Sequence, residues 1–389
     1  MATDVNHGRR YKVLFIPRWY PTADNPIHGI FVREQAQAVA EYDDVAVLYV
    51  LDPKLAGREH TGILDQLENG IRTVRGLYRR AFFLPITWMR YYWSIWRGFR
   101  YLIRQGFEPD VIHVHVFQAG VPAVVLGWIY RIPVVITEHY SGFLGPGLSY
   151  VKRIKARFAF NRARMILPVS NALGQALKQY GIRGEYRVIP NVLDTSLFYP
   201  LSAAPEPDTS KKQLLFAGSL LAVKGVPYLL RSLKLLDRDD YELHIIGDGP
   251  QRGEYEQMVL DLTLGERVTF HGRQPIEKLA DHIRRSDFLV LPSICETFGV
   301  VLIEAMGCGK PVIATDCGGP RGIVTEQVGL LVSTQDEAAL ARGIEYMLDH
   351  HQEYQSAEIA ELARERYSRA VIGEQIHKAY IDSIGTAHP

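Results

Sequence analysis

The run from residue 292 to residue 320 constrains the fold of this chain more than any other stretch. It reads PSICETFGVVLIEAMGCGKPVIATDCGGP and lies between two apolar segments, 287–291 and 311–315, that predict strands. Residues 299–306 between them predict a helix. A helix that starts soon after a strand presents the unpaired N–H groups of its first turn, and the positive end of its dipole, at the strand's carboxyl end. The run therefore predicts an anion-binding site in an α/β sheet.

Two carboxylates of this run, Glu296 and Glu304, are eight residues apart. The predicted boundaries put Glu296 in the loop before the helix and Glu304 near the helix end. A carboxylate can accept hydrogen bonds from two adjacent hydroxyl groups, which suits a sugar or a ribose. An arbitrary pair of this kind is more often one solvated loop residue and one helix-surface residue, so the spacing alone indicates little.

The same run resembles the E-x7-E signature of the retaining glycosyltransferases of family four, the group 1 type. The match continues through F-G-x-x-x-x-E-A-M, G-K-P-V-I-A and G-G-P. The resemblance implies an α/β protein of the GT-B fold, in which two Rossmann-like, doubly wound domains face each other across a cleft. It also implies a hexosyltransferase that uses a nucleotide-diphosphate sugar, retains the anomeric configuration, and needs no metal or other cofactor.

The resemblance also implies roles for residues of the second half of the chain. Glu304 is expected to bind the ribose hydroxyls, and Glu296 to hold the sugar together with three backbone N–H groups. Lys224 matches the lysine of the family's G-R-L…K-G pattern and is expected to stabilise the departing diphosphate. The three backbone groups belong to Phe298, Gly299 and Val300.

Ser219 stands where the G-R-L…K-G pattern has an arginine. One of the two cations expected at the donor's leaving group is therefore missing, and another group must replace it. Arg273, the last residue of the predicted strand segment RVTFHGR, is also expected to contact the nucleotide base. The candidate replacements are Arg18, Arg33, Arg273 and Arg321.

Two residues of the first half are expected at the same active site. Gly29 lies in a long loop before a helix predicted at 32–40, in the segment N-P-I-H-G-I-F-V-R-E-Q, and the resemblance implies that it contacts the donor diphosphate. His139 follows a predicted strand, and the resemblance places it beside the transferred sugar; we expect His139, Lys224 and Glu296 to be the catalytic residues. His113 and His115 share one side of a strand and are interpreted as packing residues, with lining of the acceptor pocket as an alternative.

Strands alternate with helical stretches along the whole chain, which predicts parallel sheets covered on both faces, with ligands bound at the carboxyl ends of the strands. The last stretch, 366–384, predicts a helix that returns to the first domain, as in GT-B enzymes. Strands are predicted at 12–16, 45–51, 71–74, 111–116, 133–137, 165–169, 186–189, 214–217, 241–246, 267–273, 287–291 and 311–315.

The length of 389 residues favours two domains. Residues 1–195 carry 25 Lys and Arg against 15 Asp and Glu, whereas the remainder carries 19 against 28, so the two halves have opposite charge. We expect an acceptor-binding domain at 1–195 with the final helix at 367–389, a donor-binding domain at 196–366, and a linker at 190–210. Three cysteines without a zinc or disulfide pattern fit a reducing cytoplasm.

The segment 72–104 holds eight arginines, no acidic residue, and many Trp, Tyr and Phe residues. Arginines mixed with tryptophans on a helix suit the interface of an anionic membrane, and 151–164 predicts a second basic helix. Two alternatives stay open. The segment can be a core helix with a solvated basic face, or a nucleic-acid surface, which the rest of the chain favours least.

These features together predict a cytoplasmic glycosyltransferase that binds peripherally to the inner face of the membrane. Its acceptor is expected to be a lipid-linked sugar, another glycan precursor of polysaccharide biosynthesis, or a small molecule, and no nucleic-acid partner is expected. A GT-B sugar-nucleotide epimerase would use the same cleft without an acceptor, although the E-x7-E pattern argues against it. A non-catalytic nucleotide-sugar-binding protein is the third hypothesis, which the serine at position 219 favours.

Overall fold

The computed structural model describes residues 9–57, 60–145, 147–201 and 211–385. The chain divides into two compact units: unit 1 is Met1–Val192 with Arg369–Pro389, and unit 2 is Leu193–Ser368. The expected boundaries were 195 and 366. Leu193 belongs to unit 2 because its N–H donates to the carbonyl of Tyr367 (2.7 Å). The part of the expected linker at 202–210 lies outside the described residues.

Unit 1 is built on a seven-stranded sheet with the order β3-β4-β2-β1-β5-β6-β7. Neighbouring strands are parallel except for β3, which runs antiparallel to β4. No strand was predicted at the position of β3. The strands are β1 (Lys12–Pro17), β2 (Asp44–Leu51), β3 (Gly62–Glu68), β4 (Ile71–Leu77), β5 (Val111–His115), β6 (Val134–Glu138) and β7 (Met165–Pro168).

The prediction of a strand at 186–189 is wrong. That segment lies alongside β7 but forms one isolated bridge, between Ile166 and Tyr186. The N–H of Ile189 donates to the carbonyl of Pro168 (3.1 Å), and Pro168 has no N–H with which to continue the ladder.

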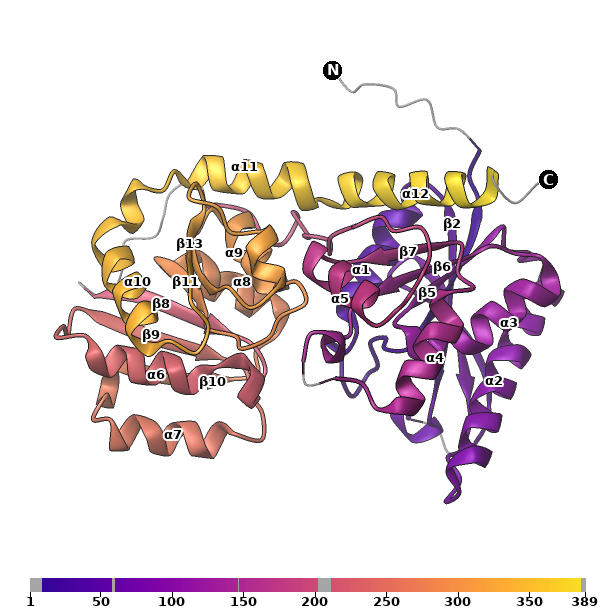
Figure 1. Cartoon of the computed structure of the whole chain (residues 1–389), viewed down its shortest axis with the longest axis horizontal. Coiled ribbons are helices and arrows are strands. Elements are labelled where there is room, and N and C mark those ends of the chain that lie inside the picture. The colour runs from indigo at the N-terminus through magenta and orange to yellow at the C-terminus, as the bar shows by residue number, and fades with distance from the viewer. Residues whose placement is uncertain (1–8, 58–59, 146, 202–210, 386–389) are drawn as a thin grey trace. The chain divides into compact units, whose positions relative to one another are not determined.

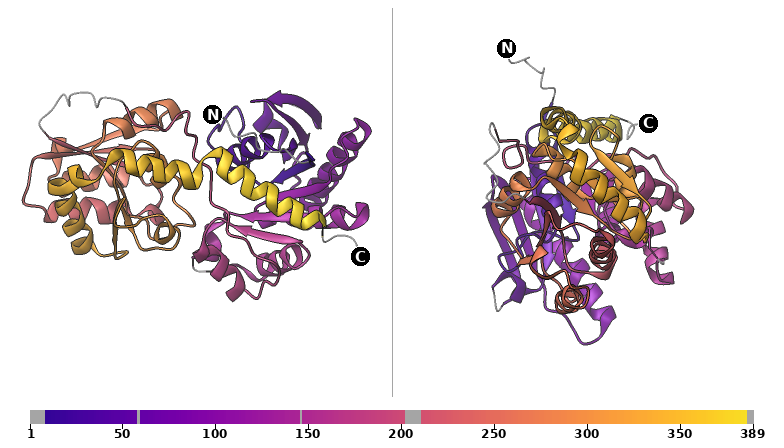
Figure 2. Two further views of the ribbon diagram at one scale, coloured as in Figure 1. Left: turned by 90° about the horizontal axis from the view of Figure 1, so that it is seen from above. Right: turned by 90° about the vertical axis from the view of Figure 1, so that its left-hand side faces the viewer.

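Helices cover both faces of the unit 1 sheet (Figure 1). Alternate residues along each strand point to opposite faces, so Val47 and Tyr49 join the core under α1 and α12, whereas Leu48 packs against Gly98 of α2. The final helix, α12, packs beside α1 and runs across unit 1 (Figure 2). The helices are α1 (Ile30–Ala40), α2 (Leu84–Arg104), α3 (Gly120–Tyr130), α4 (Tyr150–Phe160), α5 (Asn171–Gln179) and α12 (Arg369–Gly385).

Unit 2 is built on a six-stranded, fully parallel sheet with the order β10-β9-β8-β11-β12-β13. Its strands are short and apolar, as a sheet buried on both faces requires. The segment of β13 was not among the predicted strands. The strands are β8 (Lys212–Ala217), β9 (Tyr241–Ile246), β10 (Val268–Gly272), β11 (Phe288–Leu291), β12 (Val312–Thr315) and β13 (Gly329–Val332).

The hydrophobic core of unit 2 lies between its sheet and the helices α6, α7 and α10. Helices α8, α9 and α11 form a separate group, in which α9 packs against both α8 and α11. Local capping helps to define these helices. Asp336 begins α10 with a side-chain oxygen that accepts from the N–H of Ala339 (2.8 Å). The helices are α6 (Val226–Leu235), α7 (Arg252–Asp261), α8 (Ile276–Arg285), α9 (Val300–Gly307), α10 (Glu337–His350) and α11 (Ser356–Tyr367).

Each sheet has one point where the strand order reverses, between β1 and β5 in unit 1 and between β8 and β11 in unit 2. Ligands of doubly wound proteins bind at the carboxyl ends of the strands at such a point. The two units are therefore Rossmann-like, as predicted. Within the described part of the chain, no helix has both the length and the apolar character needed to cross a bilayer.

Candidate functional site

In unit 2, the loops that follow β8 and β11 meet at the point of strand reversal. The N–H of Ile294 donates to the carbonyl of Val223 (2.8 Å). Gly225 has φ 69°, and a Cβ atom there would lie 1.9 Å from the carbonyl oxygen of Pro292. Only glycine allows this approach, which holds the neighbouring Lys224 close to the loop after β11.

Lys224 and Glu296 form an ion pair between these two loops. The ammonium of Lys224 lies 2.5 Å from Oε2 of Glu296, and the two side chains are 24% and 14% exposed. The hydroxyl of Ser293 donates to the same oxygen (3.4 Å). The structure therefore brings together two of the expected catalytic residues, at a partly exposed place where a charged ligand can reach both.

The beginning of α9 offers free backbone donors beside this pair. Gly299 precedes the helix with φ 96°, and no side chain caps the helix. None of the described residues accepts a hydrogen bond from the N–H groups of Phe298, Gly299 or Val300. Unpaired N–H groups at a helix start favour an anion or a polar oxygen.

The loop that carries Glu296 is held in place from the β12 side. The N–H of Gly319 donates to the carbonyl of Glu296 (2.7 Å), and a Cβ atom at Gly319 would lie 2.4 Å from the nitrogen of Phe298. Phe298 as a whole residue is 4% exposed, and its ring packs edge-on against Tyr367. The ring of Phe298 is therefore not available to a ligand.

Four further residues that the sequence analysis singled out also lie in unit 2. Glu304 is half-buried on α9, one helical turn after Val300. Ser219 and Arg273 are exposed after β8 and β10, and Arg321 is bound to the carboxylate of Asp316 (2.8 Å). Among the described residues, no hydrogen bond or ion pair joins Ser219, Arg273 or Arg321 to Lys224 or Glu296.

In unit 1, Gly29 begins the helix whose first turn contacts His139. Gly29 begins α1 with φ 73°, and a Cβ atom there would lie 2.5 Å from the carbonyl carbon of Trp19. Phe31 is in the first turn of α1, and its ring centroid lies 4.3 Å from that of His139. The two residues singled out in the first half therefore share one neighbourhood.

Three buried histidines lie next to one another at the carboxyl edge of β5 and β6. His139 Nε2 lies 3.2 Å from His115 Nδ1, so one ring donates and the other accepts. His113 binds the hydroxyls of Tyr380 (2.6 Å) and Thr137 (2.7 Å), which confirms it as a packing residue. Burial lowers the pKa of His139 to about 3, so its imidazole is neutral at neutral pH.

Glu138 is a further candidate that the sequence did not reveal. Its buried carboxylate accepts from the N–H groups of Phe117 (3.0 Å), His139 (2.8 Å) and Tyr140 (2.7 Å). Burial raises its pKa to about 7, although the three hydrogen bonds act in the opposite direction. The available signal was an acidic residue that ends the buried strand VVITE. Its carboxylate orients the backbone on which His139 stands.

Two family models match most of the chain. The model of the glycosyl transferases group 1 matches residues 201–366, and the model of Glycosyltransferase Family 4 matches residues 29–197. Among relatives, the glycogen synthase of Mycobacterium tuberculosis is 28% identical over 260 residues, which is 63% of this chain. The aligned region spans 61% of that glycogen synthase. A putative teichuronic acid biosynthesis glycosyltransferase, TuaC of Bacillus subtilis, is 26% identical over 86% of this chain and 88% of its own.

Solved structures share the fold over nearly the whole chain. The sucrose-phosphate synthase of Thermosynechococcus elongatus matches with a TM-score of 0.79 and 23% identity, covering 97% of this chain and all of that one. Anabaena HepE in complex with UDP and glucose matches with a TM-score of 0.76 and 21% identity, covering 96% of this chain and all of that one. The likeness confirms the GT-B fold class.

Proposed function

Because the chain belongs to the group 1, family 4 glycosyltransferases, we propose that it transfers a sugar from a nucleotide-diphosphate donor to an acceptor with retention of the anomeric configuration. The observation that carries this proposal is the ion pair of Lys224 and Glu296 beside the free N–H groups that begin α9. A cation, a carboxylate and uncapped backbone donors within one small site suit a ligand that has both phosphates and sugar hydroxyls.

We propose that Lys224 stabilises the leaving diphosphate. Breaking the bond between sugar and phosphate increases the negative charge on the diphosphate, and a positioned ammonium stabilises that charge more as it grows. The ammonium is paired with Glu296. The donor phosphate would compete for Lys224 and leave an oxygen of Glu296 free to accept from a sugar hydroxyl.

We propose that Glu304 binds the ribose of the donor, and that the backbone N–H groups of residues 298–300 bind the sugar or its phosphate. No step requires a metal ion or a nucleophile of the protein, and metal independence is part of the proposal. UDP and UDP-glucose are bound by the neighbour HepE, and we propose a uridine or similar nucleotide donor here as well.

In unit 1, we propose that His139 and Gly29 contact the transferred sugar, the donor phosphate or the acceptor. A neutral His139 can donate or accept a hydrogen bond with a sugar hydroxyl without adding charge. The relative TuaC is described as a putative enzyme of teichuronic acid biosynthesis. We propose an acceptor of the same broad kind, a lipid-linked or other precursor of a cell-surface glycan, for a cytoplasmic enzyme.

A panel of nucleotide-diphosphate sugars, screened by thermal unfolding, tests the donor. A ligand that binds only the folded protein raises its stability, by about 2.7 kcal/mol at a concentration of 100 times Kd. The best donor is then incubated with and without candidate acceptors and the products are separated. Transfer to an acceptor supports the proposal. Epimerised donor in the absence of acceptor, or binding with no consumption of donor, would contradict it.

A further inference from the structure

The outer face of α2 in unit 1 exposes large apolar side chains. The inner face of α2 packs against the sheet, where Tyr91, Ile95, Phe99 and Leu102 are buried. The outer side chains are exposed by 36% to 109%, and α4 adds three more beside them. They are Phe82, Phe83, Leu84, Ile86, Met89, Trp93 and Trp96 on and before α2, and Tyr150, Val151 and Ile154 on α4.

Part of this exposed surface lines an open apolar groove of about 870 Å³ between α2 and α4. Trp88, Met89 and Trp96 line it from α2, and Val151 lines it from α4. The rings of Trp93 and Trp96 stack with their centroids 4.7 Å apart. Soluble proteins rarely expose a contiguous apolar surface of this kind unless it binds something.

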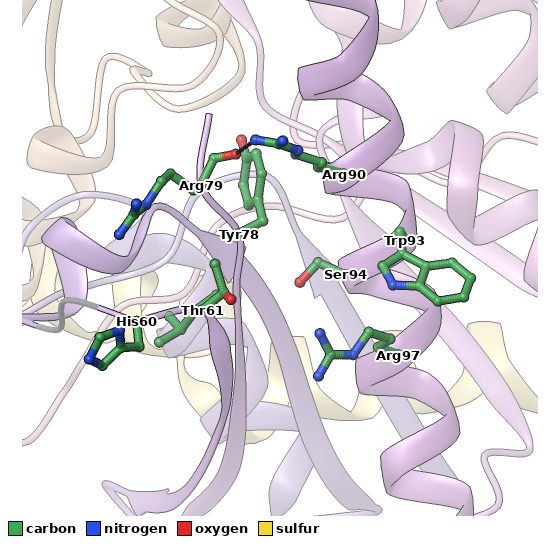
Figure 3. Close-up of a pocket in the computed structure, with 9 residues that line it drawn as sticks. His60, Thr61, Tyr78, Arg79, Arg90, Trp93, Ser94 and Arg97 are labelled. Carbon is green, nitrogen blue, oxygen red and sulfur yellow. Dashed lines mark hydrogen bonds between the residues drawn. The ribbon is translucent and has the colours of Figure 1, made fainter. Parts of the chain in front are cut away.

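A basic pocket of about 520 Å³ adjoins the groove, and Trp93 lines both (Figure 3). In Figure 3, the side chains of Arg90, Ser94 and Arg97 extend from α2 toward Tyr78, which directly follows β4. Arg79 lines the same pocket, and its carbonyl accepts from Arg90 (3.2 Å). Arg97 makes no hydrogen bond or ion pair with any residue that the structure describes.

The stretch of sequence around α2 carries arginines without acidic residues among them. No acidic residue occurs between Glu68 and Glu108. The ammonium of Lys155, on α4, lies 3.5 Å from the ring centroid of Trp88. The guanidinium of Arg100, on α2, lies 5.6 Å from the ring centroid of Trp96. The apolar groove is thus bordered by cations, and its neighbouring pocket is lined by three arginines.

We propose that this face of unit 1 docks on an anionic lipid bilayer, with a lipid phosphate in the pocket of Arg90 and Arg97 and hydrocarbon against the groove of Trp88, Met89 and Trp96. The guanidinium groups of Arg90 and Arg97 offer the charge-assisted hydrogen bonds that a phosphate requires. Tryptophans and arginines are the side chains that suit the boundary between headgroups and acyl chains. A soluble phosphate would match the pocket but would leave the exposed tryptophans without a partner.

This inference goes beyond the proposed function, and its test involves no sugar transfer, so either can fail without the other. The protein is sedimented with vesicles of phosphatidylglycerol and phosphatidylcholine in equal parts, and with vesicles of phosphatidylcholine alone. We expect binding to the anionic vesicles that weakens as salt is raised. Equal binding to both kinds of vesicle, or no binding to either, would overturn the proposal.

Single arginine variants of α2 separate the pocket from general attraction. Arg104 is exposed at the end of the same helix but does not line the pocket. Loss of one positive charge near an anionic surface weakens binding about fivefold, and we expect this for Arg104→Gln. Arg97→Gln also loses its hydrogen bonds to phosphate and should weaken binding by roughly tenfold or more. Equal effects of the two substitutions would refute the headgroup pocket.

Two further measurements test the apolar half and the source of the phosphate. Trp93→Ala with Trp96→Ala should weaken vesicle binding by roughly tenfold through lost apolar burial, while thermal unfolding verifies that the variant is folded. For the arginine variants, the control for loss of charge is the double substitution Arg285→Gln with Arg342→Gln, at two exposed positions of unit 2. Wild-type affinity in the double tryptophan variant, or release from vesicles by inorganic phosphate at unchanged ionic strength, would contradict docking on lipid.

Discussion

The ammonium of Lys224 lies 2.5 Å from Oε2 of Glu296, although the two residues are 72 positions apart in the chain. They meet because β8 and β11 are neighbours at the strand reversal of unit 2, and Gly225 allows the two loops to touch. Neither residue is fully buried, so the pair is available to a ligand. The proposed chemistry of the donor site depends on this contact.

Lys224→Ala should lower the turnover number by roughly 100-fold, because one preorganised charge at the leaving group is lost. The measurement is steady-state transfer at saturating donor, once the donor is identified. Lys278→Ala, at an exposed position of α8, is the matched control and should keep wild-type turnover. Unchanged turnover in Lys224→Ala would remove this residue from the mechanism.

Glu304→Gln should weaken donor binding by roughly tenfold or more, because a charged acceptor of ribose hydroxyls becomes a neutral amide. Calorimetric titration with the donor nucleotide measures this directly. The control is Glu345→Gln, an exposed residue of α10. Equal affinity in Glu304→Gln and the wild type would show that the carboxylate does not hold the ribose.

Gly319→Ala should disturb the donor site, whereas Gly322→Ala should not. A Cβ atom at Gly319 would lie 2.4 Å from the nitrogen of Phe298, but at Gly322 it meets nothing within 4 Å. Overpacking of this kind costs about 1–3 kcal/mol, and here it would displace the loop of Glu296 and weaken donor binding. Calorimetry on both variants tests this. Equal donor affinities would contradict the tight contact between Gly319 and this loop.

His139 should stay neutral well below pH 6. Burial lowers its pKa to about 3, so the folded state favours the neutral ring. Its contribution to stability is fully present above the unfolded pKa of about 6.5 and is lost as the pH falls toward 3, with a cost of about 2 kcal/mol at pH 5. NMR of protein labelled at histidine follows the signal that disappears in His139→Gln. An inflection of that signal near pH 6.5 would contradict the buried, neutral state.

Much of the fold was predictable because its signals are local. The apolar strands and the helix after Gly299 follow from short runs of sequence, and the structure places α9 at Val300–Gly307, where 299–306 was predicted. Unit 2 begins and ends close to the expected residues. The errors arise where pairing depends on partners elsewhere. Strand β3 is held by its antiparallel neighbour, and the predicted strand at 186–189 fails because its neighbour β7 ends in proline.

Candidate residues for the site could be named from the sequence, but the contacts between them could not. The sequence indicated Lys224, Glu296 and the start of α9 separately, and it indicated Gly29 and His139 without a link between them. The link in unit 1 is the Phe31 ring, and Glu138 went unnoticed because nothing in its sequence shows three N–H groups converging on one carboxylate. Such contacts depend on how loops from different strands pack.

The sequence by itself determined the family, the two Rossmann-like units, and the candidate residues for a donor site, because motifs and apolar periodicity are properties of neighbouring residues. The tertiary structure decided which of these side chains meet. It paired Lys224 with Glu296, buried His139 against His115, and turned the outer face of α2 into a groove with an arginine-lined pocket. Those arrangements depend on strand order and on close approach at glycines, which join residues far apart in the chain.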